Sequence, residues 1–370
     1  LWHTLSLHDA LPILEQSGYH VGYTGKGWSP GDFRRRGRER NPAGNQYSEL
    51  KLDPPENCNV SNCDYTGNFR QFLADRPADA PFCFWYGGRE PHRSYVPGEG
   101  IAHGKSLDEL GPDDVPPYWP DEETVRSDML DYAYEVEWFD MHLGRMLDEL
   151  EKIGELENTL VIVTSDNGAP FPRVKGNMYD DDFRLPCVAM WPERMEGGRV
   201  VDDLCSFIDL MPTFLEVAGA GVPEDLPGRS LADIFDGEGS GMINPERDRA
   251  YMGRERHDLG REDDVGYPVR CVRTPDYLYV RNFKPELWPA GNPETGFTGC
   301  DSSPTKSLVI AKSDEGELKY FELCFGKRPG EELYHVAEDP HCLKNLAGHP
   351  DHEETLVALR EELEQVLRET

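Results

Sequence analysis

The strongest chemical signal in the sequence is an Asp-Asn pair that follows a hydrophobic stretch. Residues 160–164 read LVIVT, and Asp166 and Asn167 come shortly after them, before Gly168. If residues 159–164 form a buried strand, the pair lies at the carboxyl edge of a sheet, where open α/β folds place their active sites. A carboxylate and an amide oxygen suit a hard cation such as Ca²⁺ or Mg²⁺. Asp-Asn-Gly is also an ordinary turn sequence, so a metal site and a turn both fit this pattern.

A second candidate is Lys26, which lies in the glycine-rich sequence GYHVGYTGKGW at residues 18–28. Glycines allow the backbone to turn tightly, and lysine presents a compact positive charge that could bind an anion. A solvated lysine on a surface loop is the alternative interpretation.

His92 and two basic residues complete the set of candidates. His92 belongs to the sequence REPHR at residues 89–93, just after an apolar run. A histidine at a strand end can hydrogen-bond an anion or transfer a proton. Arg173 and Lys175 follow Asp166 on the same expected loop and could hold an anionic group against a cation. A structural histidine and a solvated basic loop fit these patterns as well.

The elements expected around these residues alternate between strands and helices. Apolar runs predict buried strands, and apolar residues at three-to-four spacing predict a long helix over residues 122–153 that Gly154 ends. The expected strands cover residues 81–86, 159–164 and 185–191, and shorter helices cover residues 68–75 and 209–219. The alternation predicts an α/β fold with a mostly parallel central sheet flanked by helices.

The pattern changes after about residue 244. Short strand signals occur at residues 269–272, 277–280, 308–310 and 318–323, and a charged amphipathic helix is expected over residues 352–369. We therefore expect a catalytic domain over residues 14–244. A C-terminal subdomain over residues 245–370 would contain a small antiparallel sheet and the terminal helix.

The first thirteen residues receive a separate interpretation. Residues 4–13 read TLSLHDALPI, which matches one reading frame of a common sequencing-adapter oligonucleotide. We interpret residues 1–13 as an artefact joined to a truncated gene, and we exclude them from the expected fold. A genuine short amphipathic segment is the alternative.

Composition excludes several classes of protein. The chain has 370 residues, of which 38% are hydrophobic, so it can form a sizeable core. Its 38 basic and 70 acidic residues give a net charge of −32, which disfavours nucleic acid and anionic membranes as partners. We expect no membrane insertion, because no apolar stretch is long enough. The nine cysteines form no C-x-x-C pair, so zinc-knuckle and thioredoxin chemistry lack support.

Taken in order, these segments resemble the sulfatase family. GYHVGYTGKGW resembles the second sulfatase signature, and PFCFWYGGREPHR resembles the family's strand and the Pro-His segment after it. SDNGAPFPRVKGNMY resembles the metal-ligand loop of the heparan N-sulfatase (sulfamidase, N-sulfoglucosamine sulfohydrolase) branch. GRERHDLGREDDVGYPVRCVRT and ELYHVAEDPHCLKNLA are similar to the C-terminal subdomain of that branch. The resemblance covers roughly residues 14–369 and implies an alkaline phosphatase-like fold.

The resemblance implies a role for each matching residue. Asp166 and Asn167 match the family's later pair of Ca²⁺ ligands, for which Mg²⁺ is an alternative. Lys26 matches the lysine that contacts the nucleophile and the sulfate. His92 matches the histidine that binds sulfate and is a candidate for protonating the leaving group. Lys175 falls where the family places a second basic sulfate contact.

Substrate and location follow from the same resemblance. Arg254 and His257 lie in a segment that lines the substrate pocket in the sulfamidase branch. The implied partner is a sulfated saccharide, from glycosaminoglycans or marine polysaccharides, and the implied location is periplasmic or extracellular. Whether N-sulfate or O-sulfate is cleaved stays open.

The sequence departs from the family pattern in two places. Many members have a histidine one or two places after the signature lysine, where this chain has Gly27 and Trp28. The family's nucleophile is a formylglycine made from Cys or Ser in a C/S-x-P/A-x-R motif, and no cysteine here has that context. The nearest sequence, residues 300–304, lacks the arginine. We therefore expect an N-terminally truncated and inactive fragment, without the family's first Asp-Asp metal pair.

Two other functions remain as alternatives. A metal-dependent phosphohydrolase or phosphonate hydrolase of the same superfamily would use a Thr or Ser nucleophile and two metal ions held by several His and Asp residues. We find no histidine partner near Asp166 at the spacing such a site requires. The third possibility is a non-enzymatic sugar-binding relative.

Overall fold

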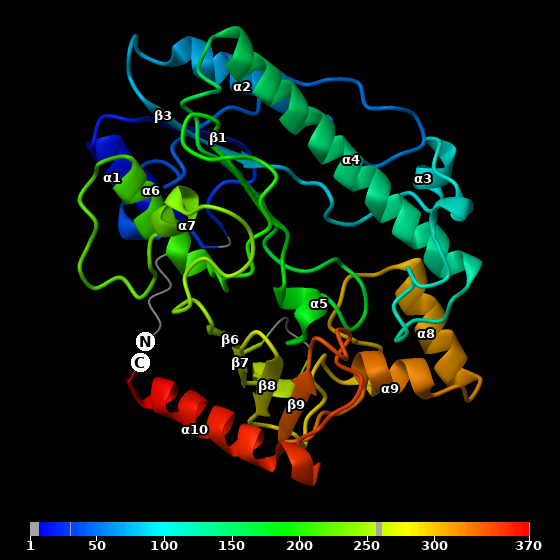
Figure 1. Cartoon of the computed structure of the whole chain (residues 1–370). Coiled ribbons are helices and arrows are strands. Elements are labelled where there is room, and N and C mark those ends of the chain that lie inside the picture. Colours follow the sequence, from blue (N-terminus) through cyan, green and yellow to red (C-terminus); the bar gives the residue numbers. More distant parts are fainter. Residues whose placement is uncertain (1–6, 30, 257–260, 370) are drawn as a thin grey trace. The chain divides into compact units, whose positions relative to one another are not determined.

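The computed structural model (Figure 1) describes residues 7–29, 31–256 and 261–369. These residues divide into two compact units. The first unit contains the described residues up to Val96, together with Tyr132–Val161 and Met190–Pro245. The second contains Pro97–Asp131, Ile162–Ala189 and the described residues from Glu246 onward. The long helix α4, Glu123–Lys152, contributes residues to both.

A parallel sheet forms the centre of the first unit. Its strand order is β2-β1-β3, with β1 at His20–Gly25, β2 at Asn45–Gln46 and β3 at Phe82–Gly87. Strands β1 and β3 pair in parallel along their whole length, from His20 opposite Phe82 to Gly25 opposite Gly87. The parallel sheet that the apolar runs predict is therefore confirmed.

Helices supply the hydrophobic core on both sides of β1. Helices α1 (Leu7–Gln16) and α6 (Leu210–Val217) pack together with Val21 and Tyr23. Helix α2 (Tyr65–Asp75) contributes Phe69 and Phe72 to a second cluster with Met146 and Leu150 of α4. Helix α7, Ala232–Asp236, also belongs to this unit. The apolar residues of these helices therefore enclose the sheet that positions Lys26 and His92.

The first thirteen residues lie partly outside the described part of the chain. Residues 1–6 are among the undescribed residues, whereas α1 begins at Leu7. Ala10 and Leu11 of α1 are buried in the first cluster. The interpretation of residues 1–13 as an artefact, like the proposed domain boundaries, stays a prediction.

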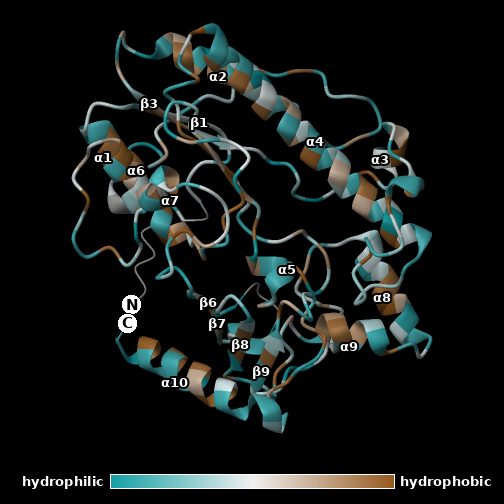
Figure 2. Ribbon diagram, viewed as in Figure 1, coloured by the Kyte–Doolittle hydropathy of each residue, from teal (hydrophilic) through white to brown (hydrophobic). Residues whose placement is uncertain are grey.

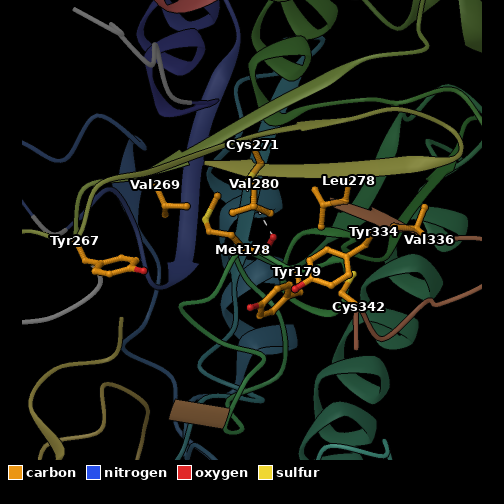
Figure 3. Packing of buried hydrophobic residues seen from close by; sticks show 10 residues of the cluster. All are labelled: Met178, Tyr179, Tyr267, Val269, Cys271, Leu278, Val280, Tyr334, Val336 and Cys342. Atoms are coloured by element: carbon orange, nitrogen blue, oxygen red, sulfur yellow. Dashed lines mark hydrogen bonds between the residues drawn. The ribbon is translucent and has the colours of Figure 1, made fainter. Parts of the chain in front are cut away.

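An antiparallel sheet and a terminal helix organise the second unit. The strand order is β6-β7-β8-β9, and every neighbouring pair is antiparallel. The strands are β6 at Ala250–Arg254, β7 at Val269–Arg273, β8 at Tyr277–Asn282 and β9 at Glu331–His335. Buried residues on one face of this sheet pack with Met178 and Tyr179, the pair that leads into helix α5 (Asp180–Phe183) (Figure 3).

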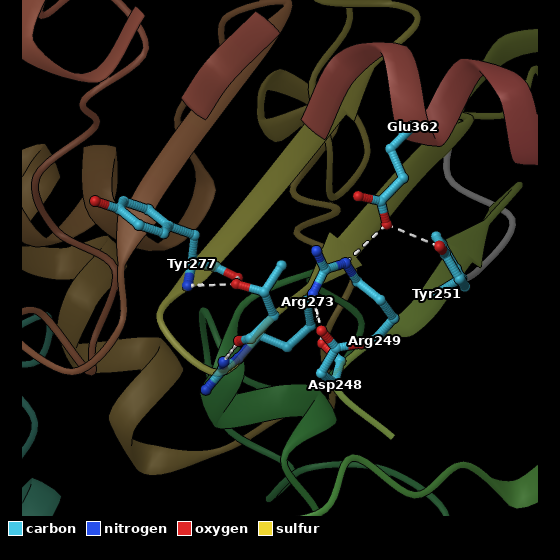
Figure 4. A network of polar contacts seen from close by, with 7 residues as sticks. Asp248, Arg249, Tyr251, Arg273, Tyr277 and Glu362 are labelled. Carbon is cyan, nitrogen blue, oxygen red and sulfur yellow. Dashed lines mark hydrogen bonds and ion pairs between the residues drawn. The ribbon is translucent and has the colours of Figure 1, made fainter. Parts of the chain in front are cut away.

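Helix α10 (Glu353–Glu369) covers the other face of the antiparallel sheet. Its apolar and hydrophilic residues alternate around the helix (Figure 2), and Leu356, Leu359 and Leu363 are buried against Val272 and Tyr279. Polar contacts add to this packing (Figure 4). The Glu362 carboxylate accepts hydrogen bonds from Arg249 Nε at 3.0 Å and from the Tyr251 hydroxyl at 2.8 Å.

Two of the expected strands in the C-terminal region are wrong. Residues 308–310 lie in helix α8 (Pro304–Asp314), and residues 318–323 fall mostly in helix α9 (Lys319–Phe325). The Ser303 side chain accepts a hydrogen bond from Lys306 N–H, and Pro304 occupies the first helical turn. These features at the N-terminus of α8 favour a helix more strongly than the short apolar run favours a strand.

The remaining short elements include the strand that precedes Asp166. Strand β4, Val161–Thr164, pairs with β5, Cys187–Met190, as a two-stranded sheet. Helix α3, Glu99–Ala102, belongs to the loop region after β3. Among the described residues, no helix combines the length and the apolar character needed to span a bilayer.

Candidate functional site

Lys26 follows the last residue of β1, and its backbone is fixed on both sides. Its N–H donates to the Gly87 carbonyl at 2.6 Å, and its carbonyl accepts a hydrogen bond from Trp85 Nε1 at 2.9 Å. Gly25 has φ of 74°, and a Cβ there would lie 2.1 Å from the Gly87 oxygen, so only glycine fits this approach. The Lys26 side chain itself is exposed.

The segment after β3 is fixed by a buried carboxylate at Glu90. Glu90 is 4% exposed, and it accepts hydrogen bonds from Ser61 N–H at 2.5 Å and from the Tyr65 hydroxyl at 3.0 Å. The same hydroxyl accepts a hydrogen bond from Arg89 N–H at 3.0 Å. Tyr65 therefore ties two consecutive residues of the segment to helix α2.

His92 is exposed at the end of this segment. Its backbone N–H donates to the Arg89 carbonyl at 2.9 Å, and its Nδ1 lies 2.5 Å from the Arg93 carbonyl. A carbonyl can only accept, so Nδ1 carries a proton in this contact. With Nδ1 engaged in this contact, Nε2 is the ring nitrogen that His92 could use to bind a ligand or transfer a proton. Because Gly25 pairs with Gly87, Lys26 and His92 both follow the same edge of the parallel sheet.

The Asp-Asn pair lies directly after β4, as the sequence predicts. Asp166 is exposed and Asn167 is partly buried. The Ser165 hydroxyl donates to the Asn167 carbonyl at 2.8 Å, and Asn167 Nδ2 donates to the Gly168 carbonyl at 2.8 Å. With its amide nitrogen engaged inside the loop, Asn167 has its amide oxygen to offer to a cation.

The donor chemistry of this pair fits a hard divalent cation, but only as part of a complete ligand set. Ca²⁺ takes about six to eight oxygen ligands. Within the described ranges, no group of three or more His, Cys, Asp or Glu side chains is arranged to hold a metal. Asp166 and Asn167 can therefore supply two oxygens, and further ligands must complete the shell.

Lys175 lies at the far end of the same loop and forms an ion pair. Its Nζ lies 2.7 Å from Asp301 Oδ2, with the lysine side chain 12% exposed and the aspartate 29% exposed. An anion that binds Lys175 must compete with this carboxylate.

Arg173 has a structural role instead of an anion-binding one. It is buried, and its guanidinium donates to the carbonyls of Leu323 at 2.7 Å and Cys342 at 2.5 Å. It also lies over the Tyr179 ring, 4.1 Å from the centroid. The interpretation of Arg173 as an anion ligand is therefore wrong, because these contacts direct the guanidinium into the core.

Sequence reasoning missed Asp182, a buried carboxylate that contacts the Asp166 loop. Asp182 is 4% exposed, and its Oδ1 accepts a hydrogen bond from Gly168 N–H at 3.1 Å. Burial raises its pKa to about 7, although backbone hydrogen bonds and the charge of Arg254 oppose that rise. The run of three aspartates at residues 180–182 is the one signal that could have drawn attention to it.

Arg254, the predicted substrate contact, ends strand β6. Its guanidinium lies over the Tyr267 ring at 5.8 Å from the centroid, and burial lowers its pKa to about 10. Asp182 is the main negative charge that opposes this fall. The other predicted substrate contact, His257, lies outside the described residues.

Comparison with known proteins identifies the family of the chain. The model of the sulfatase family matches residues 9–220, more than half of the chain. The chain belongs to the sulfatase family. A second family model, the C-terminal domain of N-sulphoglucosamine sulphohydrolase, matches residues 174–287. The predicted sulfatase membership, with its affinity to the sulfamidase branch, is therefore confirmed.

Individual relatives agree with this assignment. An ulvan-active sulfatase of Formosa agariphila is 31% identical over 258 residues, which cover 68% of this chain and 40% of the relative. Human N-sulphoglucosamine sulphohydrolase is 28% identical over 301 residues, which cover 78% of this chain and 56% of the relative. The sulfatase chain thus spans about half the length of these curated relatives.

A solved structure confirms the fold. The structure of BT4656 in complex with its substrate D-glucosamine-2-N,6-O-disulfate superimposes with a TM-score of 0.64. The similarity covers 97% of this chain and 81% of that one at 19% sequence identity. The sulfatase-type α/β fold with a C-terminal antiparallel sheet is therefore established for this chain.

Proposed function

We propose that this chain is part of a sulfatase that hydrolyses sulfate esters or sulfamates of sugars. The observation that carries the proposal is the position of the matched residues within a chain of this family. Lys26 and His92 follow the ends of two paired parallel strands, and Asp166 and Asn167 follow the end of β4. Active sites of open α/β folds form at such strand ends.

The matched residues divide the work between charge neutralisation and proton transfer. Asp166 and Asn167 would hold a divalent cation, Ca²⁺ or Mg²⁺, through one carboxylate and one amide oxygen. When bound, the cation would neutralise negative charge on the sulfuryl oxygens. Lys26 and Lys175 would bind sulfuryl oxygens with their ammonium groups, which favours the added negative charge of the transition state.

His92 would act as the general acid. Its Nδ1–H donates to the Arg93 carbonyl, which fixes the ring within its loop. Nε2 would then carry the proton that passes to the departing oxygen or nitrogen of the sugar. An exposed imidazole can be reprotonated from solvent after each turnover.

The substrate would be a sulfated sugar held by Arg254 and His257. The names of the relatives support this class, because one is ulvan-active and another is an N-sulphoglucosamine sulphohydrolase. The bound substrate of BT4656, a disulfated glucosamine, supports it as well. With a net charge of −32, the protein must attract such an anion through local basic residues.

The nucleophile is proposed to lie outside the printed sequence. The family's formylglycine arises in a C/S-x-P/A-x-R motif, and no cysteine of this chain has that context. We expect the upstream reading frame of the intact gene to encode this motif, an Asp-Asp pair and an export signal. A Thr or Ser without the arginine context would favour a phosphohydrolase, and no nucleophile at all would favour a sugar-binding protein.

A ligand-binding comparison tests the proposal on the chain itself. Calorimetric titration in calcium should show binding of N-sulfated or 6-O-sulfated glucosamine and at least tenfold weaker binding of unsulfated glucosamine. Lys26→Ala should weaken binding of the sulfated ligand. Lys319→Ala, at the exposed start of a helix, should leave that binding unchanged. Preference for glucosamine 6-phosphate over both sulfated sugars would contradict the assignment.

A further inference from the structure

We propose that Asp182 is a positioning residue that fixes the loop between Asn167 and Lys175. The proposal rests on the proposed function, in which Asn167 holds a cation and Lys175 holds a sulfate. Asp182 touches neither ligand, and it acts through the backbone of the loop.

The carboxylate of Asp182 holds both ends of this loop at once. Its Oδ1 accepts a hydrogen bond from the backbone N–H of Gly168 at 3.1 Å, and the backbone N–H groups of Gly176 and Asn177 also act to lower its pKa. Gly168 directly follows Asn167, and Gly176 directly follows Lys175. One buried side chain therefore accepts a hydrogen bond from the residue after Asn167 and interacts electrostatically with the residue after Lys175, so it restrains the loop near both proposed ligands.

Close packing against helix α5 restricts the conformation of the loop at Gly168. A Cβ at Gly168 would lie 2.6 Å from the Asp181 carbonyl oxygen and 2.7 Å from the Asp182 Cα. The backbone of the loop thus lies directly against helix α5. A side chain at position 168 would push the loop away and break its hydrogen bond to Asp182.

Helix α5 is itself anchored to the antiparallel sheet and its surroundings. Asp180 forms a bidentate ion pair with Arg273 of β7, at 2.7 and 3.0 Å. Asp181 accepts hydrogen bonds from the Tyr118 hydroxyl at 2.9 Å and contacts His341 Nδ1 at 3.1 Å. The first two aspartates of the run therefore hold the helix, and the third holds the loop.

Loss of the Asp182 carboxylate has a physical consequence that differs from general destabilisation. The Gly168 N–H loses its buried acceptor, which is costly away from water. The loop can recover by moving this group toward water. Asn167 and Lys175 would then sample many positions, and ligand binding would require them to be ordered again.

The test combines hydrogen exchange with cation binding, on the full chain. We expect the peptide covering residues 168–177 to exchange at least tenfold faster in Asp182→Ala than in the unaltered chain, with Asp182→Asn in between. Asp181→Asn is the matched control, because its partners lie outside the loop, and its exchange in this peptide should change less than twofold. Calcium affinity, measured by calorimetry with CaCl₂, should fall at least tenfold in Asp182→Ala and less than twofold in the control.

The results separate this inference from the proposed function. Unchanged exchange of the loop in both Asp182 variants would overturn the inference. Faster exchange with unchanged calcium affinity would also overturn it, since Asp182 would then only stabilise the fold. If the unaltered chain binds no calcium, the cation role in the proposed function fails, and the exchange result alone decides whether Asp182 fixes the loop.

Discussion

Two segments carry the proposed ligands, and each is fixed by a buried carboxylate in a different way. In residues 89–93 the carboxylate, Glu90, belongs to the segment and reaches outward to Ser61 and Tyr65. In the loop of residues 166–177 the carboxylate, Asp182, lies beyond the segment, accepts a hydrogen bond from Gly168 N–H, and is stabilised in its charged form by the backbone N–H groups of Gly176 and Asn177. The first segment is thus held at two adjacent residues, Arg89 and Glu90, whereas the second is restrained near both of its ends.

The difference suits the chemistry proposed for each segment. The proposed general acid, His92, needs one ring nitrogen in place, and anchors at the neighbouring residues are sufficient for that. A cation ligand and a sulfate ligand on one loop must keep a fixed separation, which requires a restraint at each end. The predictions below test whether these two restraints differ as described.

The largest effect is expected from Glu90→Ala. The change leaves the Ser61 N–H and the Tyr65 hydroxyl without their buried acceptor, which should lower the free energy of unfolding by about 4 kcal/mol. Urea denaturation measures this loss, and Glu90→Gln, which keeps an acceptor oxygen, should lose clearly less. Equal losses in the two variants would show that the hydrogen bonds are not the cause.

The two units should respond to pH in opposite directions. His142 in the first unit is buried, and burial lowers its pKa to about 4. As the pH falls from about 6.5 to 4, the unfolded chain takes up a proton that the folded chain does not, so stability decreases by roughly 3 kcal/mol. Asp182 has a raised pKa of about 7, so its contribution decreases as the pH rises from about 4 to 7.

Variants that cannot titrate separate these two contributions. His142→Gln should reduce the loss of stability that occurs as the pH falls from about 6.5 to 4. Asp182→Asn should reduce the loss of stability that occurs as the pH rises from about 4 to 7. Urea denaturation at half-unit intervals from pH 4 to 8 measures both. A profile that Asp182→Asn leaves unchanged would contradict the raised pKa of that carboxyl.

A smaller effect is expected from Tyr65→Phe, which removes only the shared hydroxyl. This hydroxyl donates to Glu90 and accepts from Arg89 N–H, so its loss should cost about 2 kcal/mol in the free energy of unfolding. Relative to the unaltered chain, backbone hydrogen exchange should be faster in residues 89–93 and unchanged in residues 168–177. Acceleration in the second peptide would mean that the two restraints are not independent.

The smallest effect concerns the ion pair at the end of the second loop. Asp301→Asn removes the charge that competes for Lys175, so affinity for inorganic sulfate should rise about threefold. Ser302→Ala, at the exposed neighbouring position, is the control and should leave sulfate binding unchanged. A weaker affinity in Asp301→Asn would show that Asp301 supports the anion site instead of competing with it.

Much of the fold follows from local sequence patterns. The expected helix over residues 122–153 agrees with α4 to within one residue at each end, because its apolar spacing is regular over many turns. The strand signals at residues 308–310 and 318–323 failed because they are short, and short apolar runs do not separate a strand from a buried helix. Helix capping by Ser303 decided the first case.

The residues of the candidate site also divide into those that the local sequence predicts and those that it does not. The sequence located Lys26, His92 and Asp166 at strand ends, because a motif and the strand before it are adjacent in the chain. Asp182 and Arg173 could not be assigned, because their contacts are made with backbone groups that only the folded chain brings near. A charged residue in a run gives no sign of whether it faces water or a buried N–H group.

The most direct test of the account is the calcium dependence of sulfated-sugar binding. Calorimetric titration of the full chain with N-sulfated glucosamine should give measurable binding in calcium. The affinity should fall at least tenfold in EDTA and in Asp166→Ala with calcium present. Equal affinity in all three conditions would contradict the role of the Asp166 loop as the site where cation and sulfate meet.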